Sequence, residues 1–222
     1  MEVWEFEPAR AHQRYHLKDG TEVQGASSIA KVDDDPSGLI YWANKLGLQG
    51  IDCNKFRDEL ADAGIVAHHL IHCHFIRKTP GLKKLSQSAV EAGTRIFEEF
   101  IEWWADNDLT WMAGEREMVS EKHRYGGTLD IAAHDLKDRV WILDVKTSKR
   151  VYPSHKYQIA GLGKLWEENE GEKVHKHMII RLPYAGGPME PYHLHNPAHC
   201  FDTFLCQLAF INSKEKSGGY KR

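Results

Sequence analysis

The sequence predicts an α/β protein in which a central mixed β-sheet is flanked by helices, with a helical N-terminal region. Two observations predict this class. Helix-like apolar periodicity before residue 110 gives way to three consecutive strand-like runs, and a helix-like stretch then separates these from further strands. The three runs favour antiparallel pairing, and the later helix is long enough to return the chain for a parallel strand.

Three helices are expected before the sheet, after a mixed N-terminal stretch with a turn at residues 18–20. The first begins after Asp35, with Pro36 at its first position, and ends near Gly47. The second is capped by Asp52 or Asn54 and runs to about residue 76, before the helix-breaking sequence 79–81. The third spans about 86–107, and its apolar face carries Ala89, Phe97, Phe100, Ile101 and Trp104.

The sheet is expected to contain strands at 112–120, 127–133 and 140–147. Ser154 then caps a helix to about residue 169, and residues 177–182 form a fourth strand. After a turn at Gly186-Gly187, residues 192–195 form a fifth strand. Pro197 opens a last helix to about residue 212, and the basic tail 214–222 is expected to fray.

Residues 125–146 contain the main functional signal, because two short apolar runs joined by a polar turn carry three charged residues. Asp130 interrupts the first run, and Asp144 and Lys146 share one face of the second because they are two residues apart. Carboxylates in otherwise buried strands cost free energy unless something pairs with them. We therefore expect a divalent cation beside this hairpin.

Several motifs together resemble one nuclease family. Residues 127–130 (GTLD) and 144–146 (DVK) resemble the GxxD and (D/E)xK elements of PD-(D/E)XK nucleases, in the RecB-like branch with phage-type exonucleases. This branch also includes mitochondrial genome maintenance and CRISPR adaptation nucleases. The upstream histidine motif resembles residues 64–68 (GIVAH), and the glutamine motif of the following helix resembles the sequence around Gln158. Segments 15–21 and 42–44 are also similar to phage-encoded relatives.

The resemblance implies a restriction-endonuclease-like core and a metal-dependent DNA exonuclease. One or two Mg²⁺ or Mn²⁺ ions would be held by His68, Asp130, Asp144 and the backbone carbonyl of Val145. A mixed nitrogen and oxygen donor set favours support by Mn²⁺. Lys146 would act on the attacking water or the scissile phosphate.

Supporting residues are also implied by the resemblance. Glu115 or Glu117, two apart on the first core strand, would assist the metal, and we favour Glu115. Gln158 would bridge water and backbone, whereas Leu162 stands where the branch often has a tyrosine.

A group of basic residues follows the hairpin and is the candidate surface for DNA. Lys149, Arg150 and Lys156 could contact phosphates, with Tyr157 beside them, although a charge run is also typical of a solvated face. The formal net charge of −3, with 14 His counted as neutral, argues against a protein that coats nucleic acid non-specifically. It does not exclude a nuclease, because basic residues can be local.

Three alternatives stay open from the sequence. The scaffold could support an endonuclease, or the chain could be a nuclease-like subunit that binds DNA without cutting it. His68 and His72 are four residues apart on a predicted helix, so they could form part of a zinc site. An iron–sulfur cluster is not expected, because the four cysteines are widely scattered and form no CxxC motif. We expect instead that the four are reduced, buried thiols, namely Cys53, Cys73, Cys200 and Cys206.

The length of 222 residues suits one nuclease domain, with a mainly helical part (1–110), a sheet core (111–195) and a C-terminal helix and tail (196–222). No apolar run approaches the roughly 20 residues of a membrane span, so we expect a cytoplasmic protein of a bacterium or a phage-infected host. The resemblance implies a role in recombination or repair. Its partners would be DNA ends, single- or double-stranded, and either further copies of the chain or a recombination protein, but no membrane.

Overall fold

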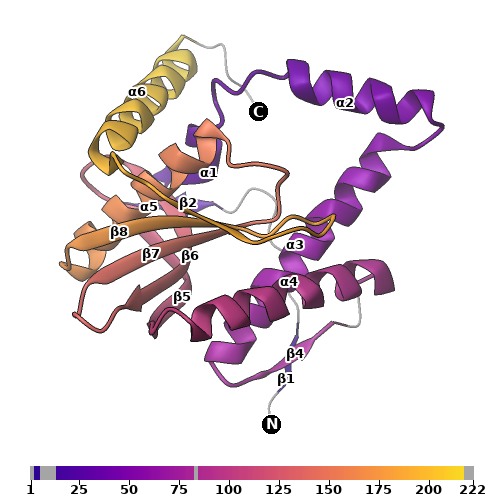
Figure 1. The fold of residues 1–222 in the computed structure, drawn as a ribbon. Helices are drawn as coiled ribbons and strands as arrows, with labels where there is room; N and C mark the ends of the chain where they lie inside the picture. The colour runs from indigo at the N-terminus through magenta and orange to yellow at the C-terminus, as the bar shows by residue number, and fades with distance from the viewer. Residues whose placement is uncertain (1–2, 6–13, 83–84, 218–222) are drawn as a thin grey trace.

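A computed structural model describes residues 3–5, 14–82 and 85–217, and every structural statement below refers to them. A five-stranded mixed sheet forms the centre, in the order β5-β6-β7-β8-β9 (Figure 1). The first three strands are an antiparallel meander, and β8 pairs parallel with β7 and antiparallel with β9. The predicted fold class is confirmed. The strands span β5 (Thr110–Ser120), β6 (Tyr125–His134), β7 (Val140–Lys146), β8 (Val174–Arg181) and β9 (Glu190–His193).

Helices cover both faces of this sheet (Figure 1). One face packs against α1 (Ala26–Ala30), α5 (Pro153–Glu170) and α6 (Pro197–Lys216), the other against α3 (Cys53–Phe75) and α4 (Gln87–Ala105). Successive strand residues point to opposite faces, so Ile142 joins the core on the α5 side and Leu143 joins the core under α3 and α4. Each buried side chain of this size contributes about 1.5–3 kcal/mol to stability.

The helix boundaries follow local capping chemistry. Asp52, one of the two predicted caps of α3, accepts hydrogen bonds from the N–H groups of Asn54 at 2.9 Å and Lys55 at 3.3 Å. The prediction that Ser154 caps α5 is wrong, because Ser154 lies buried inside the first turn, behind Pro153. There the N–H of Tyr152 instead donates to Nδ1 of His155 at 3.3 Å.

Other predicted boundaries also shift. The helix-breaking segment 79–81 forms β4 (Thr79–Gly81), which pairs parallel with β1 (Val3–Glu5). The predicted turn at 18–20 joins β2 (Tyr15–His16) to β3 (Glu22–Val23). The fifth strand lies two residues earlier than predicted, because β9 pairs with β8 over Glu190–His193. Helix α6 continues to Lys216, into the predicted frayed tail, and residues 218–222 lie outside the described part.

The predicted helix after Pro36 is present as α2 (Ser37–Leu48), yet none of its residues is buried. Its large apolar side chains are mostly in solvent, with exposed fractions of 61% for Leu39, 65% for Ile40, 71% for Tyr41 and 82% for Leu48. In Figure 1 this helix projects from the body of the protein, joined to the start of α3.

Two other expectations are settled here. The expected burial of all four cysteines is wrong for Cys206, which is exposed, and for Cys53, which is half-buried. Within the described ranges, none of the helices combines the length and the apolar character that a membrane crossing requires.

Candidate metal centre

The candidate site lies where the sheet opens between β6 and β7. These strands pair from Ile131–Leu143 to His134–Val140, and the pairing ends just before Asp130 and Asp144. The freed N–H of Val145 donates to Oδ2 of Asp130 at 2.8 Å, and Nε2 of His68 lies 3.2 Å from the Val145 carbonyl. Side chains of the site thus satisfy backbone groups that a neighbouring strand would otherwise pair.

Three side chains converge at this opening. Nδ1 of His68, on α3, lies 3.7 Å from Oε1 of Glu115 on β5 and 3.7 Å from Oδ2 of Asp130 on β6. One ligand atom from each residue lies within 4.8 Å of those of the other two. One imidazole nitrogen and two carboxylates form a donor set that fits a divalent cation of the Mn²⁺ or Mg²⁺ type. Two of the predicted ligands, His68 and Asp130, belong to this group together with Glu115, whereas Asp144 lies against Lys146.

Glu115 reaches this group through an unusual backbone conformation. The pairs Gly114–Ile131 and Arg116–Leu129 flank it, so its position in β5 is opposite Asp130. Its φ of 48° lies in the left-handed region, which non-glycine residues rarely adopt and which costs about 1–3 kcal/mol. The pairing of β5 with β6 nevertheless keeps one register from Ala113 to Ser120, through Glu115 and Glu117. Of the two glutamates, Glu115 is the one that belongs to the ligand group.

Beside the ligand group, the partly exposed Lys146 forms an ion pair with the fully buried Asp144. The ammonium nitrogen is 2.8 Å from both carboxylate oxygens and donates a hydrogen bond to Oδ1, while the buried Oδ2 lacks a hydrogen-bond partner among the described residues. Burial raises the pKa of the fully buried Asp144, as does the charge of Asp130, although Lys146 opposes both. Burial lowers the pKa of Lys146, but the charges of Asp144 and Asp130 outweigh it and raise that pKa overall. The lysine is therefore held as an ammonium.

The two carboxylates also control the charge of His68. Burial lowers the pKa of this imidazole, but the charge of Asp130 and the hydrogen bond and charge of Glu115 outweigh burial and raise the pKa to about 9. At neutral pH the imidazolium balances part of the carboxylate charge. A cation bound by the same group would replace that proton.

Two glycines of the sequence motifs permit close packing around the site. A Cβ on Gly64 would lie 3.1 Å from Oγ1 of Thr147, so glycine lets α3 approach the segment just after Lys146. A Cβ on Gly127 would lie 2.7 Å from Cδ2 of Leu162, so glycine lets α5 pack directly on β6. Leu162, at the position where a tyrosine was expected from the resemblance, belongs to the core on this face.

Two residues near the site were not predicted from the sequence. The hydroxyl of Tyr15 lies 3.0 Å from Oγ1 of Thr128, and its pKa is raised by burial and by the charges of Glu117 and Glu115. His155 is buried on α5, where desolvation and the charge of Lys146 lower its pKa to about 4. The motif at residues 15–21 could have indicated Tyr15, whereas nothing in the sequence marks His155.

The remaining predicted residues lie around α5. Gln158 is buried there, one turn after His155, and half-buried Tyr157 packs against the core. Lys149 and Arg150 are exposed on the loop before α5, and Lys156 is half-buried in its first turn. The zinc alternative is not supported, because His72 lies outside the ligand group and packs between Trp4 and Trp111, with ring centroids 5.1 Å and 6.1 Å away.

Comparison with known proteins gives no family for the chain and only distant structural likenesses. No protein-family profile matches the chain, and no curated protein matches it. Among solved structures, a presumed exonuclease from Eubacterium rectale is 11% identical with a TM-score of 0.49, over 90% of this chain and 83% of that one. LHK-Exo, solved in complex with dAMP, is 12% identical with a TM-score of 0.38, over 88% and 93% of the two chains.

Proposed function

We propose that this protein is a metal-dependent nuclease that hydrolyses phosphodiester bonds of DNA. The observation that carries the proposal is the convergence of His68, Glu115 and Asp130 within 4.8 Å at the opening that also contains the Lys146–Asp144 ion pair. An ion pair that serves only to stabilise the fold does not require a histidine and two further carboxylates beside it. A phosphodiesterase needs such a set, to hold a cation next to a positively charged side chain.

Mg²⁺ or Mn²⁺, as one or two ions, would be held by His68, Glu115 and Asp130. When bound, the ion would supply Lewis-acid chemistry to the phosphate and to the attacking water. Asp144 and the carbonyl of Val145 are proposed as further ligands. Each has a different partner in the structure, Lys146 and His68 respectively, so these contacts would be exchanged when the ion binds.

The chain's own residues would supply positioning and charge. Lys146 is an ammonium with 19% of its side chain exposed, so it can turn toward a phosphate and offset the negative charge that develops there. Asp130, fixed by the N–H of Val145, orients the open end of β7. Buried Gln158 is proposed to hold a water against this end, and Glu115 to steady the charge of His68.

We further propose that the enzyme is an exonuclease that acts in phage or bacterial recombination or repair. This narrower role is supported by the order of the sequence motifs along the chain. An endonuclease on the same scaffold would use the same residues, and a non-cleaving subunit would need only the surface that contacts DNA.

Digestion of end-labelled linear DNA, compared with closed circular DNA, distinguishes the exonuclease, the endonuclease and the non-cleaving subunit. Linear and covalently closed circular substrates would be incubated with Mg²⁺, with Mn²⁺ and with EDTA. We expect cleavage of linear DNA only, dependent on the ion, absent in Lys146→Ala and retained in Lys137→Ala at the far end of the same hairpin. Cleavage of circles would favour the endonuclease, and binding without cleavage under every condition would favour the non-cleaving subunit.

A further inference from the structure

A positively charged stretch leads away from the candidate site. From Val145 to Trp166 the sequence contains no acidic residue and five basic ones, namely Lys146, Lys149, Arg150, Lys156 and Lys164, although the whole chain has a formal net charge of −3. The loop that carries Lys149 is anchored, because Nη1 of Arg181 donates to the Lys149 carbonyl at 3.2 Å. Arg181 also pairs with Glu190, so the charge of this nearby acid is balanced.

Aromatic rings alternate with these cations. The Arg150 guanidinium lies 5.0 Å from the centre of the Tyr152 ring, and the Lys156 ammonium lies 4.7 Å from the centre of the Tyr192 ring on β9. Tyr152 is the residue just before α5, and Lys156 lies in the first turn of that helix. We call these five residues the cation–ring track: Lys149, Arg150, Tyr152, Lys156 and Tyr192.

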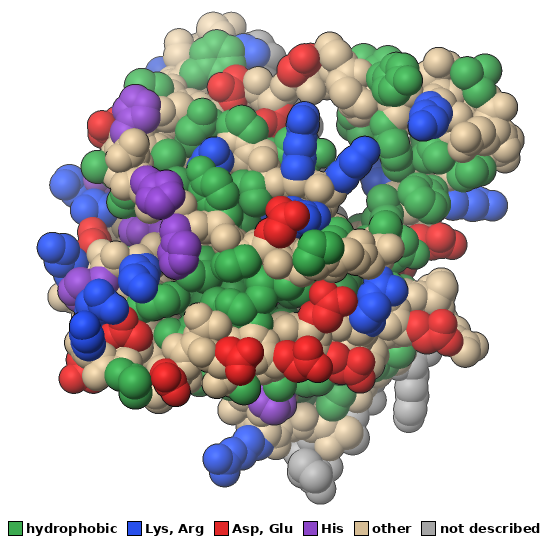
Figure 2. All heavy atoms as spheres, viewed as in Figure 1, with side chains coloured by type: hydrophobic (Ala, Val, Ile, Leu, Met, Phe, Trp, Pro, Cys, Tyr) green, Lys and Arg blue, Asp and Glu red, His purple; other side chains and the backbone are tan. Residues whose placement is uncertain are grey.

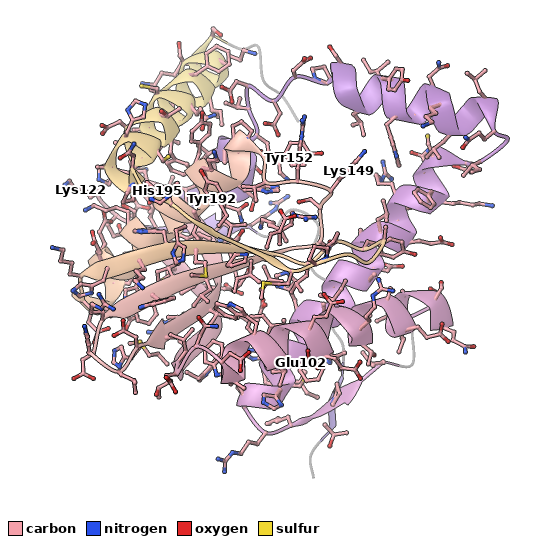
Figure 3. The ribbon with its side chains drawn as sticks, viewed as in Figure 1. Glu102, Lys122, Lys149, Tyr152, Tyr192 and His195 are labelled. Atoms are coloured by element: carbon pink, nitrogen blue, oxygen red, sulfur yellow. The ribbon has the colours of Figure 1, made fainter. Side chains whose placement is uncertain are left out.

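The track crosses one face of the protein. Figure 3 shows Lys149, Tyr152 and Tyr192 following one another across this view, with Lys149 nearest to α3, the helix that carries His68. In Figure 2 an opening separates α2 and the start of α3 from the rest of this face, and basic side chains lie at its edge. Lys149 is only three residues beyond Lys146, so the track begins close to the candidate metal centre.

We infer that the cation–ring track binds single-stranded nucleic acid and selects it over duplex. Bases of a single strand would stack on Tyr152 and Tyr192, each taking the position of the cation above the ring. The adjacent phosphates would then be contacted by the displaced cations, Arg150 and Lys156, and by Lys149. In a duplex the base faces are stacked inside the helix, so they cannot stack on the two tyrosine rings. A flexible single strand can present both its bases and its phosphates to the track. This inference rests on the proposed function, because it names the substrate of the same site.

Binding can be measured without cleavage, which separates the inference from the nuclease proposal. Fluorescence anisotropy in EDTA would compare a labelled thymidine oligonucleotide with a hairpin duplex of equal charge. Tyr152→Leu and Tyr192→Leu should each weaken single-strand binding roughly tenfold and leave duplex binding unchanged. Tyr152→Phe and Tyr192→Phe keep the ring and should bind as the wild type does. Circular dichroism would verify the fold of each variant.

The salt dependence distinguishes the roles of the cations and the rings. Each phosphate contact adds about 0.7 to the slope of log K against log salt for a single strand. Lys149→Gln, Arg150→Gln and Lys156→Gln should each lower that slope by about this amount, while the tyrosine variants keep it. The matched control is Lys214→Gln on α6, which removes a cation 4.5 Å from the Phe210 ring and should change nothing.

Each outcome bears on one claim. If Tyr152→Leu and Tyr192→Leu both bind the single strand as the wild type does, or if they weaken duplex binding equally, the inference is overturned. Selective loss in these variants supports it, even if the protein never cleaves DNA. In that case the nuclease proposal fails and the binding inference stands.

Discussion

The carboxylate of Asp130 accepts a hydrogen bond from the backbone N–H of Val145 at 2.8 Å, at the point where β6 and β7 stop pairing. The same oxygen lies 3.7 Å from Nδ1 of His68. One side chain therefore stabilises the open end of the sheet and contributes to the candidate metal centre. Changes at Asp130 should separate these two roles.

Asp130→Asn keeps an oxygen that can accept from the Val145 N–H, whereas Asp130→Ala leaves that donor without its partner. We expect the alanine variant to lose about 1–3 kcal/mol more unfolding free energy than the asparagine variant, because an unpaired buried N–H carries a desolvation penalty. Both should lose metal-dependent cleavage. Urea denaturation followed by circular dichroism measures the difference. Equal unfolding free energies for the two variants would show that this hydrogen bond does not contribute to stability.

Lys146→Met should destabilise the protein by on the order of 3 kcal/mol, because it leaves the wholly buried Asp144 without a counter-charge. Adding Asp144→Asn removes that charge and should recover most of the loss. Neither protein should cleave DNA. Thermal unfolding measures the stability of both variants, and digestion of end-labelled DNA measures their activity. If Lys146→Met were as stable as the double variant, the ion pair would not contribute to stability.

The metal-free protein should become less stable as the pH rises from about 6.5 to 9. The pKa of His68 is raised to about 9 in the folded chain, against about 6.5 for an unfolded histidine. A raised folded-state pKa gives stability that is complete below the unfolded value and is lost as the pH passes the folded one. The melting temperature in EDTA would be followed over this range, and His68→Gln should flatten the profile.

The two strand glutamates form a matched pair of variants. Glu115→Gln should weaken Mn²⁺ binding, because Glu115 belongs to the ligand group, while Glu117→Gln should leave it nearly unchanged, because Glu117 lies opposite Thr128. Isothermal titration calorimetry gives both affinities. Equal weakening would mean that bulk negative charge, and not one ligand, determines the binding.

Much of the fold could be predicted from the sequence, because its signals are local. The Asp52 cap and the hairpin that carries Asp130 and Asp144 both follow from short patterns. The pairing of β1 with β4 could not be predicted, because two strands of three residues join segments far apart in the chain. Periodicity predicted α2 but could not show that its apolar side chains stay exposed.

The site was predicted in part for the same reason. The resemblance to nuclease motifs implied roles for His68, Asp130 and Glu115, and the structure brings these three side chains together. The resemblance could not show that Asp144 is turned to Lys146, or that the Val145 carbonyl lies against His68, because these depend on how two strands separate. The left-handed backbone of Glu115 and the burial of His155 beside Lys146 are likewise set by tertiary packing.

The most direct test of the metal centre is pulsed electron paramagnetic resonance on Mn²⁺ bound to the protein. Modulation from one directly coordinated imidazole nitrogen is expected in the wild type. It should disappear in His68→Gln and persist in His72→Gln. A bound Mn²⁺ without nitrogen modulation, or a signal unchanged by His68→Gln, would contradict the assignment of His68, Glu115 and Asp130 as the metal centre of a nuclease.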